Sequence, residues 1–235
     1  SIGHALTIDG GGGIMASILA SSNTTGVVIN AAATDNVILR NITIEGVSQS
    51  AFPGNTGISL NSGRLSVEHC VIENFTANGI NNNTTQATFL SVRDTTINNV
   101  AGAGIFSKTT TGTNGVVFSH SFVYNSGSGL WAGANSDVEA SDSTFANNVG
   151  AGLYADPQGA ANALMSVHHI TSSHNAHGAL AASGGTIRMG DSVVTFNTIN
   201  GVLGSGSGVV DSYLDNYVQD NAGSQTFTLP SLSKS

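Results

Sequence analysis

The sequence predicts an all-β protein, a right-handed single-stranded parallel β-helix (solenoid) of about eight to nine coils with 22–26 residues each. Three observations predict it: a glycine followed by an aliphatic residue recurs at this interval, short alternating segments lie between these glycines, and no stretch shows the sustained period of a long helix. We expect the solenoid to span residues 1–223, with an incomplete first coil, and residues 224–235 to form a C-terminal tail that covers its end.

The repeat is marked by a glycine near the start of one strand in each coil. Gly57 is followed by Ile58, and the same kind of pair returns every 22–26 residues. Because neighbouring side chains of a strand point to opposite faces, the first and third residues after each glycine should point inward and the second outward. The repeating glycines are Gly57, Gly79, Gly104, Gly129, Gly152, Gly178 and Gly201.

Each unit also ends on an asparagine. Asparagine tolerates the left-handed backbone, and its amide can pair with the same residue in the next coil. We therefore expect one ladder of turn-stabilising asparagines along the solenoid. Its members are Asn74, Asn99, Asn125, Asn148, Asn175, Asn197 and Asn221.

The units resemble a known repeat family. They have the form Val-x-x-Ser/Cys-x-Ile/Val-x-x-Asn followed by Gly-Ile/Leu, and so the chain resembles the right-handed parallel β-helix repeat proteins of the pectate-lyase-like superfamily. The opening segment from Leu6 to Gly13 resembles a branch of secreted bacterial members with little assigned function. The resemblance implies the fold and an extracellular or cell-surface location, and it raises the hypothesis of a polysaccharide-cleaving enzyme. The family's catalytic residues have no counterpart here, so none is assigned.

Charge and composition exclude several kinds of partner. The formal net charge is −8, and only six residues are Lys or Arg, whereas nucleic acid phosphates require clusters of basic residues. Nucleic acid is therefore not expected as a partner, and a polyanionic glycan is disfavoured. No apolar stretch reaches the roughly 18 to 20 residues of a membrane span. Cys70 is the only cysteine, so we expect no intrachain disulfide and a small buried side chain.

The outward position after the glycine carries three aromatic residues in successive coils, followed by two leucines. Coils stack about 4.8 Å apart, so these side chains should form one exposed strip. Aromatic rings offer apolar faces to the C–H groups of sugars, and we expect the strip to bind carbohydrate or a partner. Two alternatives stay open: a loop or second subunit covers the strip, or the rings only stabilise cross-strand pairing. The predicted ligand-binding residues are Phe106, Trp131, Tyr154, Leu180, Leu203, Lys108 and Asp156.

A second column, at the bend between two other strands, alternates histidine and aspartate. Alternation brings His and Asp within hydrogen-bonding reach and avoids stacking like charges. We expect a structural polar ladder, and leave open a general base or a transition-metal ligand. No metal is expected, because no coil concentrates several ligands; His168, His169, His174 and His177 crowd one coil but should lie on different faces. The ladder residues are His69, Asp94, His120, Asp142, His169 and Asp191.

The pattern favours binding over catalysis. Elimination from a uronate needs cations or calcium and a base, and hydrolysis needs two carboxyl groups facing a groove, but only Asp156 lies on the aromatic face. We expect a non-catalytic extracellular solenoid that binds polysaccharide or a cell-surface glycan, serves as a surface or fibre scaffold, and uses no cofactor. The alternative is a polysaccharide lyase or glycoside hydrolase. Unpaired strand edges also predict end-to-end or side-by-side self-association.

Overall fold

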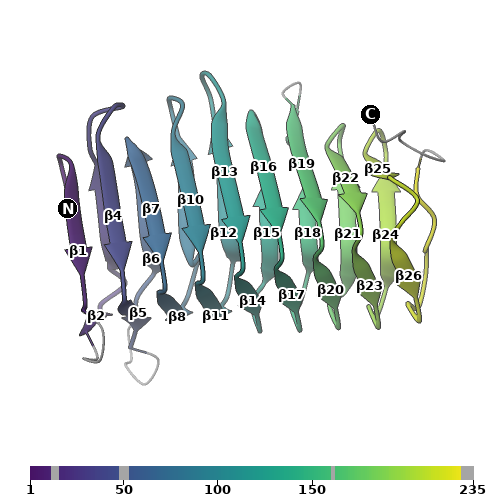
Figure 1. Cartoon of the computed structure of the whole chain (residues 1–235), viewed down its shortest axis with the longest axis horizontal. Coiled ribbons are helices and arrows are strands. Elements are labelled where there is room, and N and C mark those ends of the chain that lie inside the picture. The colour runs from purple at the N-terminus through teal and green to yellow at the C-terminus, as the bar shows by residue number, and fades with distance from the viewer. Residues whose placement is uncertain (12–15, 48–52, 160–161, 229–235) are drawn as a thin grey trace.

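The computed structural model describes residues 1–11, 16–47, 53–159 and 162–228. Within these ranges the chain forms strands β1 to β26 and no helix, and the strands pair in parallel in three sheets. Each coil contributes one strand to each sheet, and the coils stack in a row from the N-terminal to the C-terminal end (Figure 1). The predicted fold class, an all-β parallel solenoid, is confirmed.

We number the sheets by their first strand. Sheet 1 contains β1 (Leu6–Asp9), β4 (Asn36–Arg40), β7 (Arg64–Glu68), β10 (Phe89–Arg93), β13 (Asn114–Ser119), β16 (Ser136–Ser141), β19 (Ala163–His168), β22 (Thr186–Gly190) and β25 (Val209–Ser212). Sheet 2 contains β2 (Ala16–Ala20), β5 (Ile42–Gly46), β8 (Val71–Phe75), β11 (Thr96–Val100), β14 (Phe122–Tyr124), β17 (Thr144–Ala146), β20 (Thr171–Ser173), β23 (Val193–Thr195) and β26 (Tyr217–Gln219). Sheet 3 contains β3 (Thr25–Asn30), β6 (Thr56–Ser62), β9 (Ile80–Thr84), β12 (Ala103–Thr109), β15 (Ser128–Ala132), β18 (Ala151–Ala155), β21 (His177–Ala182) and β24 (Asn200–Ser205).

The repeating glycines lie where the chain enters sheet 3, and the requirement there is space. A Cβ atom on Gly57 would lie 2.5 Å from the carbonyl oxygen of Gly79, and one on Gly79 would lie 2.7 Å from that of Gly104. Neither distance is compatible with a side chain, so successive coils can approach this closely only at glycine. These glycines do not have a positive φ, so backbone conformation is not what selects them.

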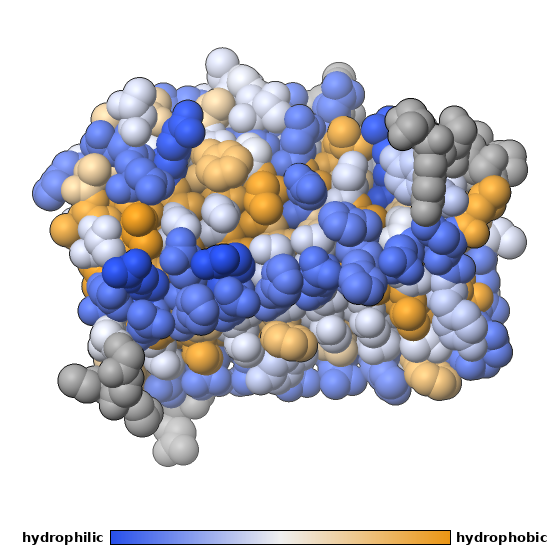
Figure 2. Space-filling model, viewed as in Figure 1, coloured by the Kyte–Doolittle hydropathy of each residue, from blue (hydrophilic) through white to orange (hydrophobic). Residues whose placement is uncertain are grey.

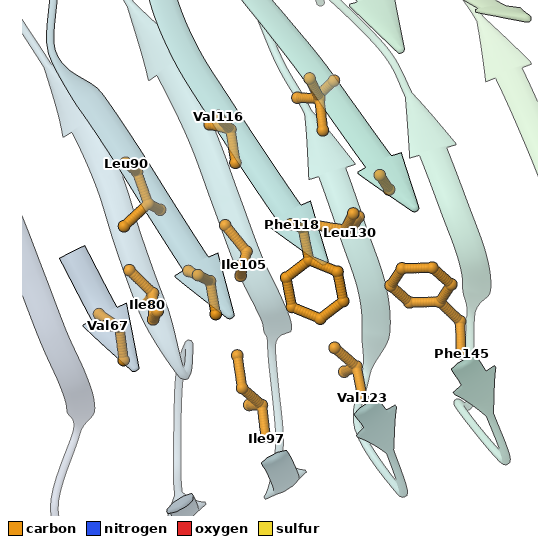
Figure 3. Close-up of a cluster of buried hydrophobic side chains, with 14 of the residues drawn as sticks. Val67, Ile80, Leu90, Ile97, Ile105, Val116, Phe118, Val123, Leu130 and Phe145 are labelled. Carbon is orange, nitrogen blue, oxygen red and sulfur yellow. The ribbon is translucent and has the colours of Figure 1, made fainter. Parts of the chain in front are cut away.

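The inward side chains fill the solenoid as strand alternation predicts. Ile58 and Leu60 of β6 are fully buried, and Leu153 and Ala155 of β18 occupy the equivalent positions. At the middle of the solenoid the rings of Phe118 and Phe145 lie 5.4 Å apart, between aliphatic side chains from all three sheets (Figure 3). The core is therefore one continuous column of stacked side chains.

Two bends in each coil turn on a single residue with left-handed backbone. At the bend from sheet 1 to sheet 2, φ lies between 45° and 56° in every coil from Asn41 to Asp191. This bend carries the predicted His–Asp column. At the bend from sheet 2 to sheet 3, the left-handed residues are Asn74, Asn99, Asn125, Asn147, His174, Phe196 and Asp220.

The single asparagine ladder predicted from the sequence is wrong, because its members fall in two adjacent columns. Asn74, Asn99 and Asn125 occupy the left-handed position, and their amides reach toward solvent. The remaining members follow the left-handed residue by one position and are buried: Asn148, Asn175, Asn197 and Asn221. The sequence pattern does not reveal the shift between the two columns. Several coils have a residue other than asparagine at the left-handed position, so their asparagine belongs to the buried column.

The buried asparagines form a continuous chain of hydrogen bonds. Nδ2 of Asn148 donates to Oδ1 of Asn175 at 2.9 Å, and Asn197 donates to Asn221 in the same way at 2.8 Å. Gln225 accepts from Asn221 at 3.2 Å at the C-terminal end of the chain of bonds. Residues 224–228 pair with the last coil through Ser224 and Thr228; the rest of the predicted tail lies outside the described residues.

A buried polar network interrupts the apolar column beside β9 and β12, and the sequence did not predict it. Asn82, Ser107 and Asn114 are fully buried. Nδ2 of Asn114 donates to the carbonyl oxygens of Lys108 at 3.0 Å and Asn82 at 3.1 Å. The Thr88 hydroxyl lies 2.7 Å from Oδ1 of Asn82. These bonds satisfy amides that would otherwise be costly to bury.

Candidate functional site

The structure brings the three aromatic residues together on the outer face of sheet 3. Phe106 of β12 pairs in register with Trp131 of β15, which pairs with Tyr154 of β18. The ring centroids lie 4.9 Å apart for Phe106 and Trp131, and 5.0 Å apart for Trp131 and Tyr154. Leu180 and Leu203 continue the same column on β21 and β24. We call these five residues the aromatic strip.

The aromatic strip is half-buried, and its surface is corrugated. The ring planes of Phe106 and Trp131 are inclined by 60°, and those of Trp131 and Tyr154 by 41°. Each ring therefore packs against its neighbour with part of its face or edge left to solvent. Nε1 of Trp131 is buried and has no hydrogen-bond partner. An indole N–H normally finds an acceptor when buried, so this donor is the one unsatisfied polar group of the strip.

Lys108 and Asp156 lie beside the aromatic strip, in the next outward column. Between them in that column is Gly133, whose missing side chain leaves room for the stem of Lys108 and the edge of the Phe106 ring. Two coil spacings, about 10 Å, separate the Lys108 and Asp156 positions. They therefore do not form an ion pair; Lys108 is half-buried, and Asp156 is buried, with 9 % of its surface exposed.

Asp156 is held firmly by its neighbours. The hydroxyl of Tyr154 donates to Oδ2 of Asp156 at 2.7 Å, and the backbone N–H of Gln158 donates to Oδ1 at 2.9 Å. Burial, with the adjacent carboxylate, raises the pKa of Tyr154 to about 12. At neutral pH the phenol is thus protonated and oriented by Asp156, and each oxygen of the buried carboxylate already accepts one hydrogen bond.

Charge is divided unevenly among the faces of the solenoid. The strands of sheet 3 contain no carboxylate, and Lys108 is their one Lys or Arg. The described arginines all lie on sheet 1, as do Asp9, Glu68, Asp137, Glu139 and Asp211. Sheet 3 therefore offers a nearly uncharged aromatic face, while sheet 1 carries most of the charged side chains that lie on strands.

The His–Asp column is divided into one pair and one group of three residues instead of forming one continuous ladder. Asp142 lies between two histidines, 2.8 Å from Nδ1 of His169 and 3.8 Å from Nε2 of His120. Nε2 of His69 lies 3.5 Å from Asp94. The hydrogen bond from His169 lowers the pKa of Asp142. Among the described side chains, no ion pair joins Asp94 to His120.

At the C-terminal end of this column, Asp191 makes no His contact of this kind; its backbone N–H donates to Oδ1 of Asp215 at 2.9 Å. Along the described part of the chain, no group of three His, Cys, Asp or Glu side chains is placed to hold a metal ion. The crowded histidines are spread out: His168 ends β19, His169 and His174 occupy the two bends, and His177 begins β21. Burial lowers the pKa of His177.

Cys70 follows His69 at the bend from sheet 1 to sheet 2 and lies in an inward column of small residues. It is 2 % exposed, and burial raises the pKa of its thiol. The column stabilises each turn, because the hydroxyls of Thr95 and Ser121 accept the backbone N–H of Cys70 and Thr95 respectively. Cys70 is therefore a packing residue that solvent does not reach.

Grooves occur away from the aromatic strip. A groove of about 670 Å³ follows the bend from sheet 2 to sheet 3 between Phe75 and Val149, and no ionisable side chain lines it. Two smaller grooves lie on the outer face of sheet 1 around Phe89. The sequence repeat alone did not predict the sheet 1 grooves, although alternation from the inward Leu90 places Phe89 outward.

Among the residues that the structure describes, no helix has the length and apolar character needed to span a membrane. A search of curated proteins found no match, and a search of solved structures found none either. The family described as "Right handed beta helix region" matches residues 57–222, which is more than half of the chain. This match and the stacked parallel sheets agree, and the chain belongs to the right-handed β-helix family.

Proposed function

We propose that this protein is a non-catalytic carbohydrate-binding solenoid, and that a single polysaccharide or cell-surface glycan chain lies along the aromatic strip. The observation that carries the proposal is the stack of Phe106, Trp131 and Tyr154 on an otherwise nearly uncharged face. Aromatic rings bind the C–H faces of sugars, and sugar hydroxyl groups find partners at Lys108 and at the Tyr154 hydroxyl, which the buried Asp156 holds in place. The low charge of sheet 3 favours a neutral glycan.

The geometry supports a chain running parallel to the solenoid axis. One aromatic ring per coil gives a repeat of about 5 Å, which is close to the length of one sugar unit in an extended chain. The inclined rings do not form a single plane, so the strip suits separate sugar units better than the flat surface of a crystalline polymer. Leu180 and Leu203 extend the apolar track by two more coils.

Substitution of Trp131 by alanine tests the proposal. We expect Trp131→Ala to weaken binding of a neutral oligosaccharide about tenfold or more, since a stacked aromatic contributes on the order of 1 kcal/mol beyond its buried area. Phe122→Ala is the matched control, because Phe122 is an exposed aromatic, 51 % accessible, on sheet 2. Calorimetry against a panel of oligosaccharides gives the affinities, and unchanged affinity in Trp131→Ala contradicts the proposal.

The same panel separates binding from catalysis. Hydrolysis of a glycosidic bond ordinarily uses two carboxyl groups, and Asp156 is the one carboxylate beside the aromatic strip in the described part of the chain. We expect no new reducing or unsaturated ends after incubation, with or without calcium. Release of such products would favour the alternative function, a polysaccharide lyase or glycoside hydrolase.

The proposal also includes a location for the protein, outside the cell or on its surface. Membership of the pectate-lyase-like superfamily, and of its secreted branch, would place the protein outside the cell or on its surface, where polysaccharides are accessible. A surface or fibre scaffold is compatible with glycan binding, since regular stacked coils present the strip as a rigid rod. Sedimentation velocity over a range of protein concentrations tests end-to-end or side-by-side association; a constant sedimentation coefficient at all concentrations would contradict self-association.

A further inference from the structure

The outer face of sheet 1 carries an apolar groove with unpaired carboxylates at one end. One outward column runs in register across five strands, from β7 to β19: Arg64, Phe89, Gly115, Asp137 and Leu164. Two hollows of about 310 and 450 Å³ share Phe89, Gly115 and Asp137, so they form one groove along this column. Figure 2 views this face and shows apolar surface over β10 and β13, above a continuous hydrophilic band.

Phe89 and Gly115 shape the middle of the groove. The Phe89 side chain is 41 % exposed, which is unusual for an aromatic residue on the face of a sheet. Its ring leans over the next coil, because a Cβ atom on Gly115 would lie 3.1 Å from Cδ2 of that ring. The ring thus covers part of Gly115, whose missing side chain makes room for it, and the groove continues past the ring to Asp137.

Asp137 and Glu139 have no partner of their own. They are successive outward residues of β16, both are exposed, and neither makes an ion pair or side-chain hydrogen bond within the described ranges. Two other acids of sheet 1 are engaged: Asp9 lies 2.8 Å from Nε of Arg40, and Glu68 accepts a hydrogen bond from the Ser66 hydroxyl at 2.8 Å. The groove therefore combines an exposed ring with two uncompensated negative charges.

We propose that this groove binds an extended segment of a polypeptide partner, and that an arginine side chain of that segment lies against the exposed ring of Phe89, on the side of Asp137. Because the ring leans over β13, a guanidinium against it would lie about one coil spacing, roughly 5 Å, from the strand that carries Asp137. That position allows a cation–π contact with the ring, which acts within about 6 Å, and a two-point hydrogen bond to a carboxylate.

The dimensions and the other end of the groove favour a polypeptide. From Arg64 to Leu164 the column spans four coil spacings, about 19 Å, which is the length of about six extended residues. Arg64 at the far end pairs with an acidic side chain of the segment, and Leu164 contacts an apolar one. A peptide supplies basic, acidic and apolar groups within this length.

The experiment uses the full chain and the peptide acetyl-Glu-Leu-Arg-Leu-Gly-amide. Its control replaces arginine by citrulline, which keeps the shape and removes the charge. NMR titration reports both the affinity and the amides that shift. We expect shifts in β10, β13 and β16, and a dissociation constant about fivefold higher for the citrulline peptide, the upper range for an exposed ion pair.

Variants of the protein complete the test. Asp137→Asn combined with Glu139→Gln should reduce the affinity for the arginine peptide about fivefold and abolish its preference over citrulline, whereas Asp220→Asn removes an exposed charge elsewhere and should change neither. Trp131→Ala should leave peptide binding intact, so the two sites are judged separately. Equal affinity for both peptides, absence of peptide binding, or tighter binding of an amino-sugar oligomer in this groove would each overturn the proposal.

Discussion

Asn175 is expected to be a stability-determining residue of the solenoid, through the buried amide chain. It is 1 % exposed. Its Oδ1 accepts the backbone N–H of Asn148 at 2.9 Å and Nδ2 of the same residue at 2.9 Å. Its own Nδ2 donates to the carbonyl oxygen of Phe145 at 3.0 Å. Replacement by alanine removes all of these bonds at once.

The magnitude follows from the groups that Asn175→Ala leaves without a partner. The buried backbone N–H of Asn148 loses its acceptor, and Nδ2 of Asn148 keeps only a long contact of 3.4 Å to the carbonyl oxygen of Val123. A stranded buried polar group costs about 1–3 kcal/mol. With one donor stranded and a second weakened, we expect the free energy of unfolding to fall by about 3 kcal/mol.

Asn61 provides the matched control, because it makes an amide–amide bond between coils at the surface. Its Nδ2 donates to Oδ1 of Asn30 at 2.8 Å, and both side chains are exposed, so water can replace the bond. Asn61→Ala should cost about 0.5 kcal/mol or less. Urea unfolding followed by circular dichroism measures both variants, and hydrogen exchange at the Asn148 amide reports the local change. Equal shifts in the two variants would refute the reasoning.

Three further predictions concern titratable groups. Asp156→Asn should lower the pKa of Tyr154 from about 12 while leaving it above 10.0, since burial is the larger cause; ultraviolet titration of the phenol measures this. Hydrogen bonds from Asn41 and the Gly11 backbone, with Arg40, lower the pKa of Asp9 from 3.8 to about 2, so it stabilises the fold above pH 3.8 and loses this effect as the pH falls through about 2. Asp9→Asn should therefore make the urea midpoint of unfolding depend less on pH in the acid range. An unchanged pH dependence of this midpoint would contradict the prediction. Cys70 should react with a thiol reagent only after unfolding, since it is buried and its pKa is raised; rapid labelling of the native protein would contradict its placement.

Strand alternation was the most informative sequence signal for the site. From one glycine per coil it placed Leu153 and Ala155 inward and Tyr154 outward, and the structure has them so. The reasoning works because side-chain direction alternates strictly along a strand, and the parallel register repeats that direction from coil to coil. Strand alternation therefore predicted the aromatic strip from the residues after each glycine, and the positions of the bends were not needed.

The bends were harder to predict. Asparagine, histidine, phenylalanine and aspartate all occur at the left-handed position between sheets 2 and 3, as Asn125, His174, Phe196 and Asp220 show. Residue type therefore does not mark the position, and counting asparagines joined two columns into one. The structure separates them, because backbone hydrogen bonds between coils determine which residue faces inward.

The sequence by itself determined the solenoid, the coil length, the inward and outward faces of sheet 3, and the aromatic strip, because each depends on local periodicity repeated along the chain. Only the tertiary structure decided which charges meet. It paired Asp142 with His169, enclosed Asn114 in a buried network, and left Asp137 unpaired beside the Phe89 ring. The physical reason is that coil stacking brings together residues about 22 to 32 positions apart, and small differences in bend and loop length change which side chains become neighbours.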